Sequence, residues 1–330
     1  MGTDTDFESG LHTLFTRVFG DPARLESFKR LSGGASQETW ALSGGGKEAI
    51  LRRAPGGVSA ARSSAAIGLP TEAALIQAAR MQNVPAPAVL LVLTPSDGLG
   101  DGFLMDRIAG ETIARPILRD DLFSNARSIL AKKCGEALAG IHSISLSELP
   151  ELPTSNGLAQ IAQYEEIYRS FDTPRPVFEL ALAWLKANAP DMDELVLIHG
   201  DFRLGNLMVD ETGLAAVLDW ELAHIGDPRE DLAWICVNSW RFGQSQNRVG
   251  GFGQLEDMLV HYNQASGRNI QAREIDWWEM LGTLKWGVMC MIMYEAFRSG
   301  ADPSVERAAI GRRVSETEID LINLLEAQNA

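Results

Sequence analysis

Residues 195–206 read LVLIHGDFRLGN, in which an apolar run is followed at once by His199, Asp201, Arg203 and Asn206. The apolar run predicts a short buried strand, so the polar side chains fall at its end. A turn in this place needs only one Asn or Asp, and a buried polar group costs stability unless it has a partner. The stretch therefore has more polar chemistry than a turn requires, and we interpret it as a functional loop.

A second apolar run, Leu214–Leu218, follows this loop and ends at Asp219. Asn206 lies five residues after Asp201, and Asp219 lies 18 residues after Asp201. A hairpin at this spacing brings the two carboxylates and the amide together at one end. Such oxygen ligands suit a hard cation such as Mg²⁺, which usually shares its coordination with substrate phosphates. The spacing predicts a metal site, with one acid left to orient a hydroxyl nucleophile.

The hydrophobic periodicity differs between the two parts of the chain. Residues 4–19 place apolar side chains on one helical face, and residues 28–54 read as short extended runs broken by glycine pairs. A helix is expected at Thr71–Met81 with Thr71 as its N-cap, and two more strands within residues 84–93 and 102–108.

Beyond Gly110 the periodicity becomes mainly helical. We expect helices over residues 120–142, 158–170, 176–188, 229–242, 254–266, 274–298 and 303–327, with two short strands within 195–221. The sequence predicts an α+β, bilobal fold. Its small N-terminal lobe, residues 1–107, has an antiparallel sheet and a helix, and its larger C-terminal lobe, residues 108–330, is mainly helical.

Composition narrows the class of partner. The chain has 330 residues, 45% of them hydrophobic, and a formal net charge of -15. Residues 1–107 carry 10 basic and 11 acidic side chains, whereas residues 108–330 carry 19 and 33. An acidic surface disfavours nucleic acid and anionic membranes, so we expect neither as a partner. The oligomeric state is left open.

The sequence gives no sign of export or of a membrane span. No apolar run reaches the roughly 18 residues of a transmembrane helix, and the acidic N-terminus lacks the pattern of a signal peptide. Three widely spaced cysteines, Cys134, Cys236 and Cys290, lie in apolar segments and are predicted to be reduced core thiols. We expect a cytoplasmic protein.

Three stretches together resemble the aminoglycoside phosphotransferase family, which includes choline kinase-like and other small-molecule kinases. They are HGDFRLGN (199–206), VLDWELAHIGDPREDLAW (217–234) and FLMDRIAGET (103–112). The likeness runs from Leu31 to Trp234, and the stretches look similar to a bacterial small-molecule kinase branch. It implies a protein-kinase-like fold that binds ATP and Mg²⁺ between its lobes.

The resemblance implies a role for each matching residue of the loop and the hairpin. Asp201 resembles the catalytic Asp that orients the substrate hydroxyl. Asn206 and Asp219 resemble the metal ligands. His199 resembles a loop-stabilising histidine, not a chemical base. Asp231 suits helix capping or bracing of this loop.

The small lobe supplies the expected nucleotide-binding residues. In LSGGASQETW (31–40), glycines let backbone amides approach phosphates, although glycine pairs also form ordinary hairpin turns. We assign this role to Ser32, Gly33, Gly34 and Ser36.

A cationic residue is also expected to contact the phosphates. In EAILRRAPGG (48–57), Arg52 takes the place where the family usually has a phosphate-binding Lys, and an arginine can hold an anion bidentately. Glu72 would be its ion-pair partner, or else simply an acid favoured at a helix N-terminus. The backbone from Asp106 to Ile108 would bind the adenine edge, or serve as a plain connector.

We therefore predict an ATP-dependent phosphotransferase that transfers the γ-phosphate to a hydroxyl of a small molecule. The acceptor stays open between an aminoglycoside-like and a hydroxyacyl-CoA-like compound. One alternative is a nucleotide-binding pseudokinase with a sensing or scaffolding role, for which Arg52 is the departure. Another is a metal-dependent hydrolase that would use His199, Asp201, Asp219 and His224.

Overall fold

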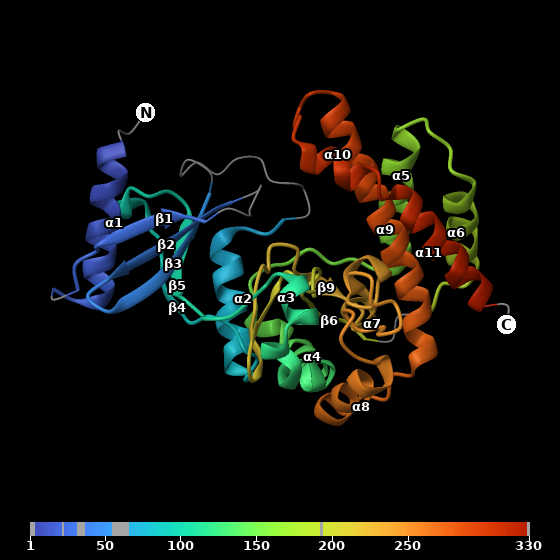
Figure 1. Ribbon diagram of the computed structural model, residues 1–330, viewed down its shortest axis with the longest axis horizontal. Helices are drawn as coiled ribbons and strands as arrows, with labels where there is room; N and C mark the ends of the chain where they lie inside the picture. The colour runs from blue at the N-terminus through green and yellow to red at the C-terminus, as the bar shows by residue number, and fades with distance from the viewer. Residues whose placement is uncertain (1–3, 22, 32–36, 55–65, 192–193, 329–330) are drawn as a thin grey trace.

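The protein has an α+β fold with two lobes, seen in a computed structural model that describes residues 4–21, 23–31, 37–54, 66–191 and 194–328. The first helix and the strands β1 to β5 lie at one end of the molecule, and the long helices near the C-terminus lie at the other (Figure 1).

The small lobe is built on one antiparallel sheet with the strand order β1-β2-β3-β5-β4. Its strands are β1 (Ser27–Arg30), β2 (Glu38–Gly44), β3 (Lys47–Arg53), β4 (Val89–Val92) and β5 (Gly102–Asp106). β2 and β3 form a hairpin in which Gly44 pairs with Lys47, and Gly45 and Gly46 turn the chain with positive φ angles. The predicted meander is confirmed.

The two faces of this sheet are covered by different helices because successive strand residues point to opposite sides. Helix α1 (Asp4–Phe19) buries Leu11, Leu14 and Phe15 in one cluster with Leu51 of β3 and Leu104 of β5. The leading amphipathic helix predicted from the sequence is thus confirmed.

Helix α2 (Leu69–Met81) packs on the other face, where its Ile76 belongs to the same core cluster as Ile50, Phe103 and Met105. The prediction that Thr71 caps this helix is wrong. The helix begins two residues earlier, with Gly68 as the N-cap and Pro70 in the first turn, where proline needs no amide partner.

The large lobe is mainly helical. Its α-helices are α3 (Ala114–Arg119), α4 (Ser124–His142), α5 (Gly157–Ser170), α6 (Pro176–Ala187), α7 (Arg229–Trp234), α8 (Leu255–Ser266), α9 (Ala272–Arg298), α10 (Val305–Gly311) and α11 (Val314–Ala327). Helix α9 packs against α5, α6, α7, α10 and α11, and α4 packs against α8. Within the described residues, no helix combines the length and apolarity that crossing a bilayer requires.

Four short strands lie between these helices, where two were predicted. β6 (Val196–Ile198) pairs with β9 (His224–Gly226), and β7 (Leu207–Asp210) pairs with β8 (Gly213–Val217). The β7–β8 hairpin therefore lies between the two partners of the other pair in the sequence. This nesting brings the loop after β6 beside the segment between β8 and β9.

Two predicted helices are shorter than expected. The segment 229–242 is α-helical only to Trp234. A 3-10 helix over Asn238–Arg241 follows, the Arg241 guanidinium donates to the carbonyl of Cys236, and the chain then turns at Phe242, which has a φ of 48°. The segment 303–327 breaks between α10 and α11. At the break, Gly311 lies so close to α9 that an added Cβ would be 2.6 Å from the Cβ of Tyr294.

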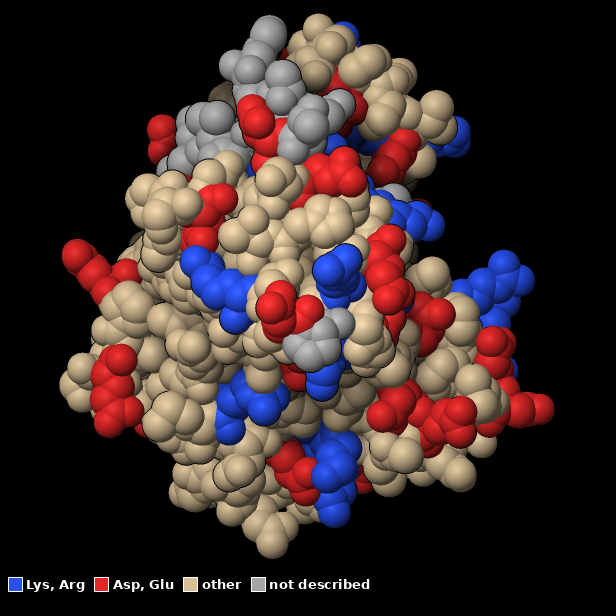
Figure 2. Space-filling view, turned by 90° about the vertical axis from the view of Figure 1, so that its left-hand side faces the viewer, with Lys and Arg blue, Asp and Glu red and all other residues tan. Residues whose placement is uncertain are grey.

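The small-lobe face seen in Figure 2 carries both positive and negative side chains, and neither sign dominates. Figure 2 views the molecule from the end that carries α1 and the sheet, and there Lys and Arg side chains are mixed with Asp and Glu. This mixture agrees with the near balance of charge in residues 1–107. The three cysteines are buried and free, as predicted.

Candidate active site

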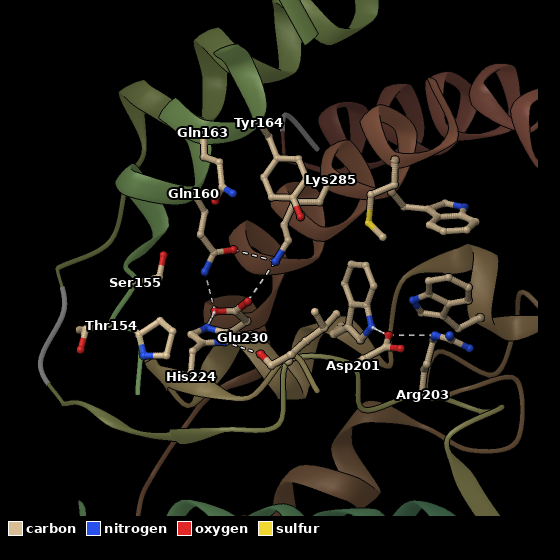
Figure 3. Close-up of a pocket in the computed structure, with 17 residues that line it drawn as sticks. Thr154, Ser155, Gln160, Gln163, Tyr164, Asp201, Arg203, His224, Glu230 and Lys285 are labelled. Atoms are coloured by element: carbon tan, nitrogen blue, oxygen red, sulfur yellow. Dashed lines mark hydrogen bonds and ion pairs between the residues drawn. The ribbon is translucent and has the colours of Figure 1, made fainter. Parts of the chain in front are cut away.

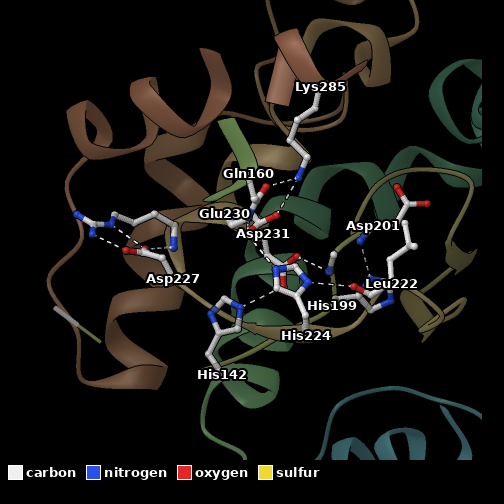
Figure 4. A network of polar contacts seen from close by, with 12 residues as sticks. His142, Gln160, His199, Asp201, Leu222, His224, Asp227, Glu230, Asp231 and Lys285 are labelled. Atoms are coloured by element: carbon white, nitrogen blue, oxygen red, sulfur yellow. Dashed lines mark hydrogen bonds and ion pairs between the residues drawn. The ribbon is translucent and has the colours of Figure 1, made fainter. Parts of the chain in front are cut away.

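The loop after β6 is held by one buried carboxylate. Asp231 of α7 accepts hydrogen bonds from the backbone amides of His199 at 2.7 Å and Gly200 at 3.0 Å, and its other contact is His142 Nε2 at 3.2 Å (Figure 4). Gly200 has a φ of 83°, and a Cβ there would meet the carbonyl oxygen of Leu222 at 2.4 Å. Only glycine fits this crossing without strain.

His199 joins the loop to the next strand end. Its Nε2 donates to the carbonyl of Leu218 at 3.0 Å, and its Nδ1 accepts the amide N–H of Asp201 at 3.2 Å. Burial lowers the pKa of His199, although Asp231 and Asp201 oppose this effect. A neutral imidazole with both nitrogens bonded to backbone fits the structural interpretation of this residue.

Asp201 lies at the floor of a cavity, with its carboxylate oriented by three donors. Its Oδ1 accepts from Arg203 Nε at 2.9 Å and from the indole N–H of Trp234 at 2.8 Å, and its Oδ2 accepts from Asn206 Nδ2 at 2.6 Å. The Arg203 guanidinium lies 4.6 Å from the ring centre of Trp240. Charge-assisted hydrogen bonds of this kind fix both position and orientation.

Asn206 and Asp219 flank the same end of the β7–β8 hairpin. The amide of Leu218 donates to the carbonyl of Asn206 at 2.8 Å, and Asp219 follows with a left-handed φ of 63°. The Asn206 side-chain amide contacts Asp201, whereas the Asp219 carboxylate, beside Asn206 at the hairpin end, contacts Arg52. An amide oxygen together with a carboxylate is a donor set that fits Mg²⁺.

Arg52 crosses from the small lobe to this hairpin. Its Nη2 lies 2.5 Å from Asp219 Oδ1, and its Nε lies 3.1 Å from Glu72 Oε1 and donates to Gln37 Oε1 at 2.5 Å. Burial opposes the charge of Arg52, but Glu72 and Asp219 outweigh it and raise the pKa of Arg52.

Glu72 occupies the deepest position of this ion-pair group, with an exposure of 1%. Burial raises its pKa, and Arg52 offsets part of that rise. Neither of its oxygens accepts a well-aligned hydrogen bond from the described residues. Glu221 Oε2 lies 4.0 Å from Arg52 Nη2 and accepts from Gln37 Nε2 at 3.1 Å, so Glu221 belongs to the same group.

A cavity of about 280 Å³, here called the inter-lobe cavity, opens beside Arg52. Its lining includes Arg52, Glu72, Asp106, Ile108 and Asp219, five of the residues predicted from the sequence. Apolar side chains from both lobes complete it, among them Ile50, Phe103, Met105, Met208 and Leu218.

The N–H of Asp106 bonds to the carbonyl of Ala88, so it is engaged within the small lobe, whereas Ile108 lies two residues beyond β5. The predicted residues Ser32, Gly33, Gly34 and Ser36 lie outside the described residues.

A second cavity of about 310 Å³, here called the Asp201 cavity, lies on the large-lobe side of Asp201 (Figure 3). Side chains from α5, α7 and α9 line it. Lys285 of α9 donates to Gln160 Oε1 at 2.7 Å and to Glu230 Oε1 at 3.0 Å, and Glu230 also lies 3.2 Å from His224 Nε2.

The sequence patterns gave no role to Lys285, Gln160 or Glu230, and His224 was predicted to act only in the hydrolase alternative. Lys285 and Gln160 lie within helical patterns, and only their position beside Asp201 distinguishes them from surface residues. Among the arginines of the large lobe, Arg203 lines the cavity, whereas Arg241 and Arg248 are paired with Glu279, and Arg298 is paired with Glu295.

The hydrolase alternative finds no support in this geometry. Among the described residues, no group of three or more His, Cys, Asp or Glu side chains converges as a metal site. His199 bonds to backbone and His224 to Glu230 and the Leu222 carbonyl.

The sequence matches a family model, the phosphotransferase enzyme family, over residues 27–267, and the chain belongs to this family. It is 29% identical over 212 residues to acyl-CoA dehydrogenase family member 10 of Mus musculus, covering 62% of this chain and 20% of that protein. It is 24% identical to an aminoglycoside 3'-phosphotransferase of Niallia circulans, covering 54% of this chain and 71% of that one. The chain thus spans a fifth of the first of these relatives.

Solved structures confirm the protein-kinase-like fold. A putative aminoglycoside phosphotransferase from Ralstonia eutropha matches with a TM-score of 0.76 at 20% identity, covering 97% of this chain and 98% of that chain. An aminoglycoside phosphotransferase in a ternary complex with AMP-PNP and hygromycin B matches with a TM-score of 0.60 at 17% identity, covering 97% and 99%. The family match and the structural matches therefore agree on a phosphotransferase-family chain with a protein-kinase-like fold.

Proposed function

We propose that the protein is an ATP-dependent kinase that phosphorylates a hydroxyl group of a small molecule. The observation that carries this proposal is the position of Asp201 and Asp219. Asp201 lines one cavity and Asp219 lines the other, and Asn206 joins the two because it contacts Asp201 and flanks Asp219 at the hairpin end. Phosphoryl transfer needs an acceptor site and a nucleotide site that meet at such a point.

Asp201 would accept a hydrogen bond from the acceptor hydroxyl and take its proton as the oxygen attacks. Arg203, Trp234 and Asn206 hold the carboxylate in one orientation for this task. Because their three bonds leave further lone pairs on the two oxygens, the carboxylate can still accept a substrate hydroxyl. Positioned general bases of this kind contribute about 10²–10⁴-fold to rate.

Asn206 and Asp219 would hold Mg²⁺, and the inter-lobe cavity would hold the nucleotide against Arg52 and the backbone near Ile108. Mg²⁺ bound there supplies neutralisation of the phosphate charge. Arg52 would contribute fixed N–H donors toward phosphate oxygens, while Glu72 holds its guanidinium in place.

The proposal is tested by Mg²⁺-dependent phosphorylation of a pooled panel of aminoglycosides, macrolides, amino alcohols, sugars and hydroxyacyl compounds. Wild type, Asp201→Asn and Asp219→Ala are compared, with the exposed Asp121→Asn as the matched control. We expect Asp201→Asn to lose at least about 100-fold in turnover while it retains nucleotide binding. Asp219→Ala should weaken Mg²⁺-dependent nucleotide binding itself.

Two results would decide against this function. If the protein binds no nucleotide with or without Mg²⁺, the inter-lobe cavity is not a nucleotide-binding site. A protein that binds nucleotide, but in which neither wild type nor Asp201→Asn phosphorylates an acceptor, behaves as a pseudokinase, and measurable turnover that is equal in the two shows that Asp201 is not the catalytic residue.

A further inference from the structure

The charge of each carboxylate that lines the Asp201 cavity is already balanced by a cation of the protein, an observation that bears on the acceptor if the proposed function holds. Among the described residues, Asp201 and Glu230 are the acids that line it. Asp201 is paired with the Arg203 guanidinium at 2.9 Å, so it keeps lone pairs for a hydroxyl but no unbalanced charge for an ammonium group. A polycationic acceptor needs acidic partners for its ammonium groups, because a buried charge is costly unless it is paired.

Glu230 is likewise fully engaged, as Figure 3 shows. It accepts from Lys285 Nζ at 3.0 Å and Gln160 Nε2 at 2.6 Å, and it lies 3.2 Å from His224 Nε2. Burial acts to raise the pKa of Glu230, but Lys285 and His224 outweigh it and hold that pKa well below the usual range. Glu230 is therefore a carboxylate whose charge is balanced by its own neighbours.

Lys285, by contrast, keeps a donor toward the cavity. Its ammonium has three N–H groups, and within the described residues two are used, by Gln160 and Glu230. Its side chain is 13% exposed and lines the cavity. The Lys285 Nζ lies 5.4 Å from the ring centre of Trp234 and 5.6 Å from that of Tyr164. Because an aromatic ring attracts the ammonium charge but has no oxygen acceptor, the third N–H can still donate to an oxygen of a ligand.

Trp234 connects Lys285 with Asp201. Its indole N–H bonds to Asp201, and the same indole ring lies beside the Lys285 ammonium. A molecule lying across this ring would reach Asp201 with one end and Lys285 with the other. The indole of Trp234 therefore spans the space between the two groups.

The wall of the cavity between these points is apolar. Trp240 stacks between Trp234 and Trp286, with ring centres 5.4 Å and 4.7 Å apart, and Met289 and Leu222 extend the surface. Such a wall binds the hydrocarbon part of a ligand by removing it from water.

We propose that Lys285 is a specificity-determining residue that binds a carboxylate or carbonyl oxygen of the acceptor while the acceptor hydroxyl lies at Asp201. The cavity then takes hydroxylated acids or acyl compounds with an apolar body, and it rejects polyamines such as aminoglycosides. Lys285 acts on binding, so its loss affects KM for oxygen-bearing acceptors more than kcat.

The test compares acceptors of one carbon skeleton that differ in a single group. A homologous series of hydroxycarboxylates, their methyl esters and the matching amino alcohols is assayed, with kanamycin as the polycation. We expect wild type to prefer the carboxylates or esters. Lys285→Met should raise KM for them by roughly 10- to 100-fold, the value of one lost charge-assisted hydrogen bond, and leave KM for amino alcohols nearly unchanged.

Further variants separate specificity from folding. The double variant Lys285→Met/Glu230→Gln removes both charges, so no unpaired acid is left buried, and it should show the same selective loss. Lys285→Arg should recover part of the affinity. Lys133→Met, at a partly exposed position on α4, makes the same chemical change away from the cavity and should leave every KM unaltered.

Preference of wild type for kanamycin or for amino alcohols overturns the inference, as does an equal loss with every acceptor in Lys285→Met. Binding is read independently by titrating the fluorescence of the cavity tryptophans with the hydroxycarboxylates. No titratable binding, or equal binding by wild type and Lys285→Met, also overturns it. Failure of the proposed function is recognised separately, because it shows as absent nucleotide binding or as turnover unaffected by Asp201→Asn.

Discussion

Replacing Asp231 by asparagine tests whether this one carboxylate holds the loop that carries Asp201. Asp231 is completely buried and accepts from the amides of His199 and Gly200 and from His142. Asparagine keeps the shape of the side chain but replaces one acceptor oxygen by an NH₂ group and removes the charge. Whichever way the amide is turned, at least one backbone N–H of the loop then faces a donor.

The expected cost follows from these contacts. A hydrogen bond to a charged group contributes about 1.5–3 kcal/mol, and an amide left unsatisfied in a buried site costs about 1–3 kcal/mol. We therefore expect Asp231→Asn to lose about 2–5 kcal/mol in the free energy of unfolding, measured by urea titration. The exposed Asp121→Asn serves as the control and should change it by less than about 0.5 kcal/mol.

The pH dependence provides a second readout of the same contacts. Burial acts to raise the pKa of Asp231, but His142, His199 and their hydrogen bonds outweigh it, so its pKa in the folded protein lies below the ordinary 3.8. A lowered pKa means that the stabilisation is full above the ordinary pKa and is lost as the pH falls through the folded value. The difference between wild type and Asp231→Asn should be constant near neutral pH and should shrink on acidification.

This reasoning is refuted if Asp231→Asn unfolds within about 0.5 kcal/mol of wild type. It is also refuted if the difference grows as the pH falls. Either result would mean that the loop is held by its own backbone and not by Asp231.

Three further changes probe the rest of the site. Trp234→Phe keeps an aromatic ring but removes the indole donor to Asp201, so kcat/KM for the acceptor should fall roughly 10- to 100-fold in steady-state assays, and an unchanged value would show that Arg203 and Asn206 suffice. Arg52→Lys keeps the charge but loses the planar guanidinium that contacts Glu72 and Asp219 together, so the nucleotide affinity measured by calorimetry should drop about tenfold, and Arg52→Met should bind more weakly still. Equal affinities in the three proteins would contradict a phosphate-binding role. Gly200→Ala forces a side chain into a positive φ and against the Leu222 carbonyl, so thermal unfolding should reveal a loss of about 2 kcal/mol or more, and wild-type stability would show that the crossing is looser than its geometry implies.

Local patterns in the sequence were enough to predict the lobes and the order of elements. The amphipathic helix at residues 4–19, the meander and the apolar runs beside Asp201 and Asp219 are all set by short-range periodicity and turn residues. The positions of Asn206 and Asp219 at one hairpin end also follow from local sequence, because the length of a hairpin determines which residues lie at its end. Asn206 in turn contacts Asp201. The partner of Arg52 came from resemblance to the family, and Glu72 lies where that resemblance placed it.

The boundaries of helices were harder to predict from local sequence than the presence of each helix. Helix α2 begins at Leu69 because Pro70 suits a first turn, which the choice of Thr71 as the cap overlooked. The break between α10 and α11 depends on how closely Gly311 approaches α9, a contact between segments that periodicity cannot relate.

The character of the Asp201 cavity was decided by tertiary structure alone. Lys285, Glu230 and Gln160 come from three helices separated by 55 to 125 residues, and each is an ordinary member of its own helical pattern. Trp234 likewise reads as a core residue until its indole N–H is seen to reach Asp201. The sequence determined where the carboxylates of Asp201 and Asp219 lie along the chain, because their spacing is local. Only folding decided which charges face them, because long-range packing selects partners that no short pattern records.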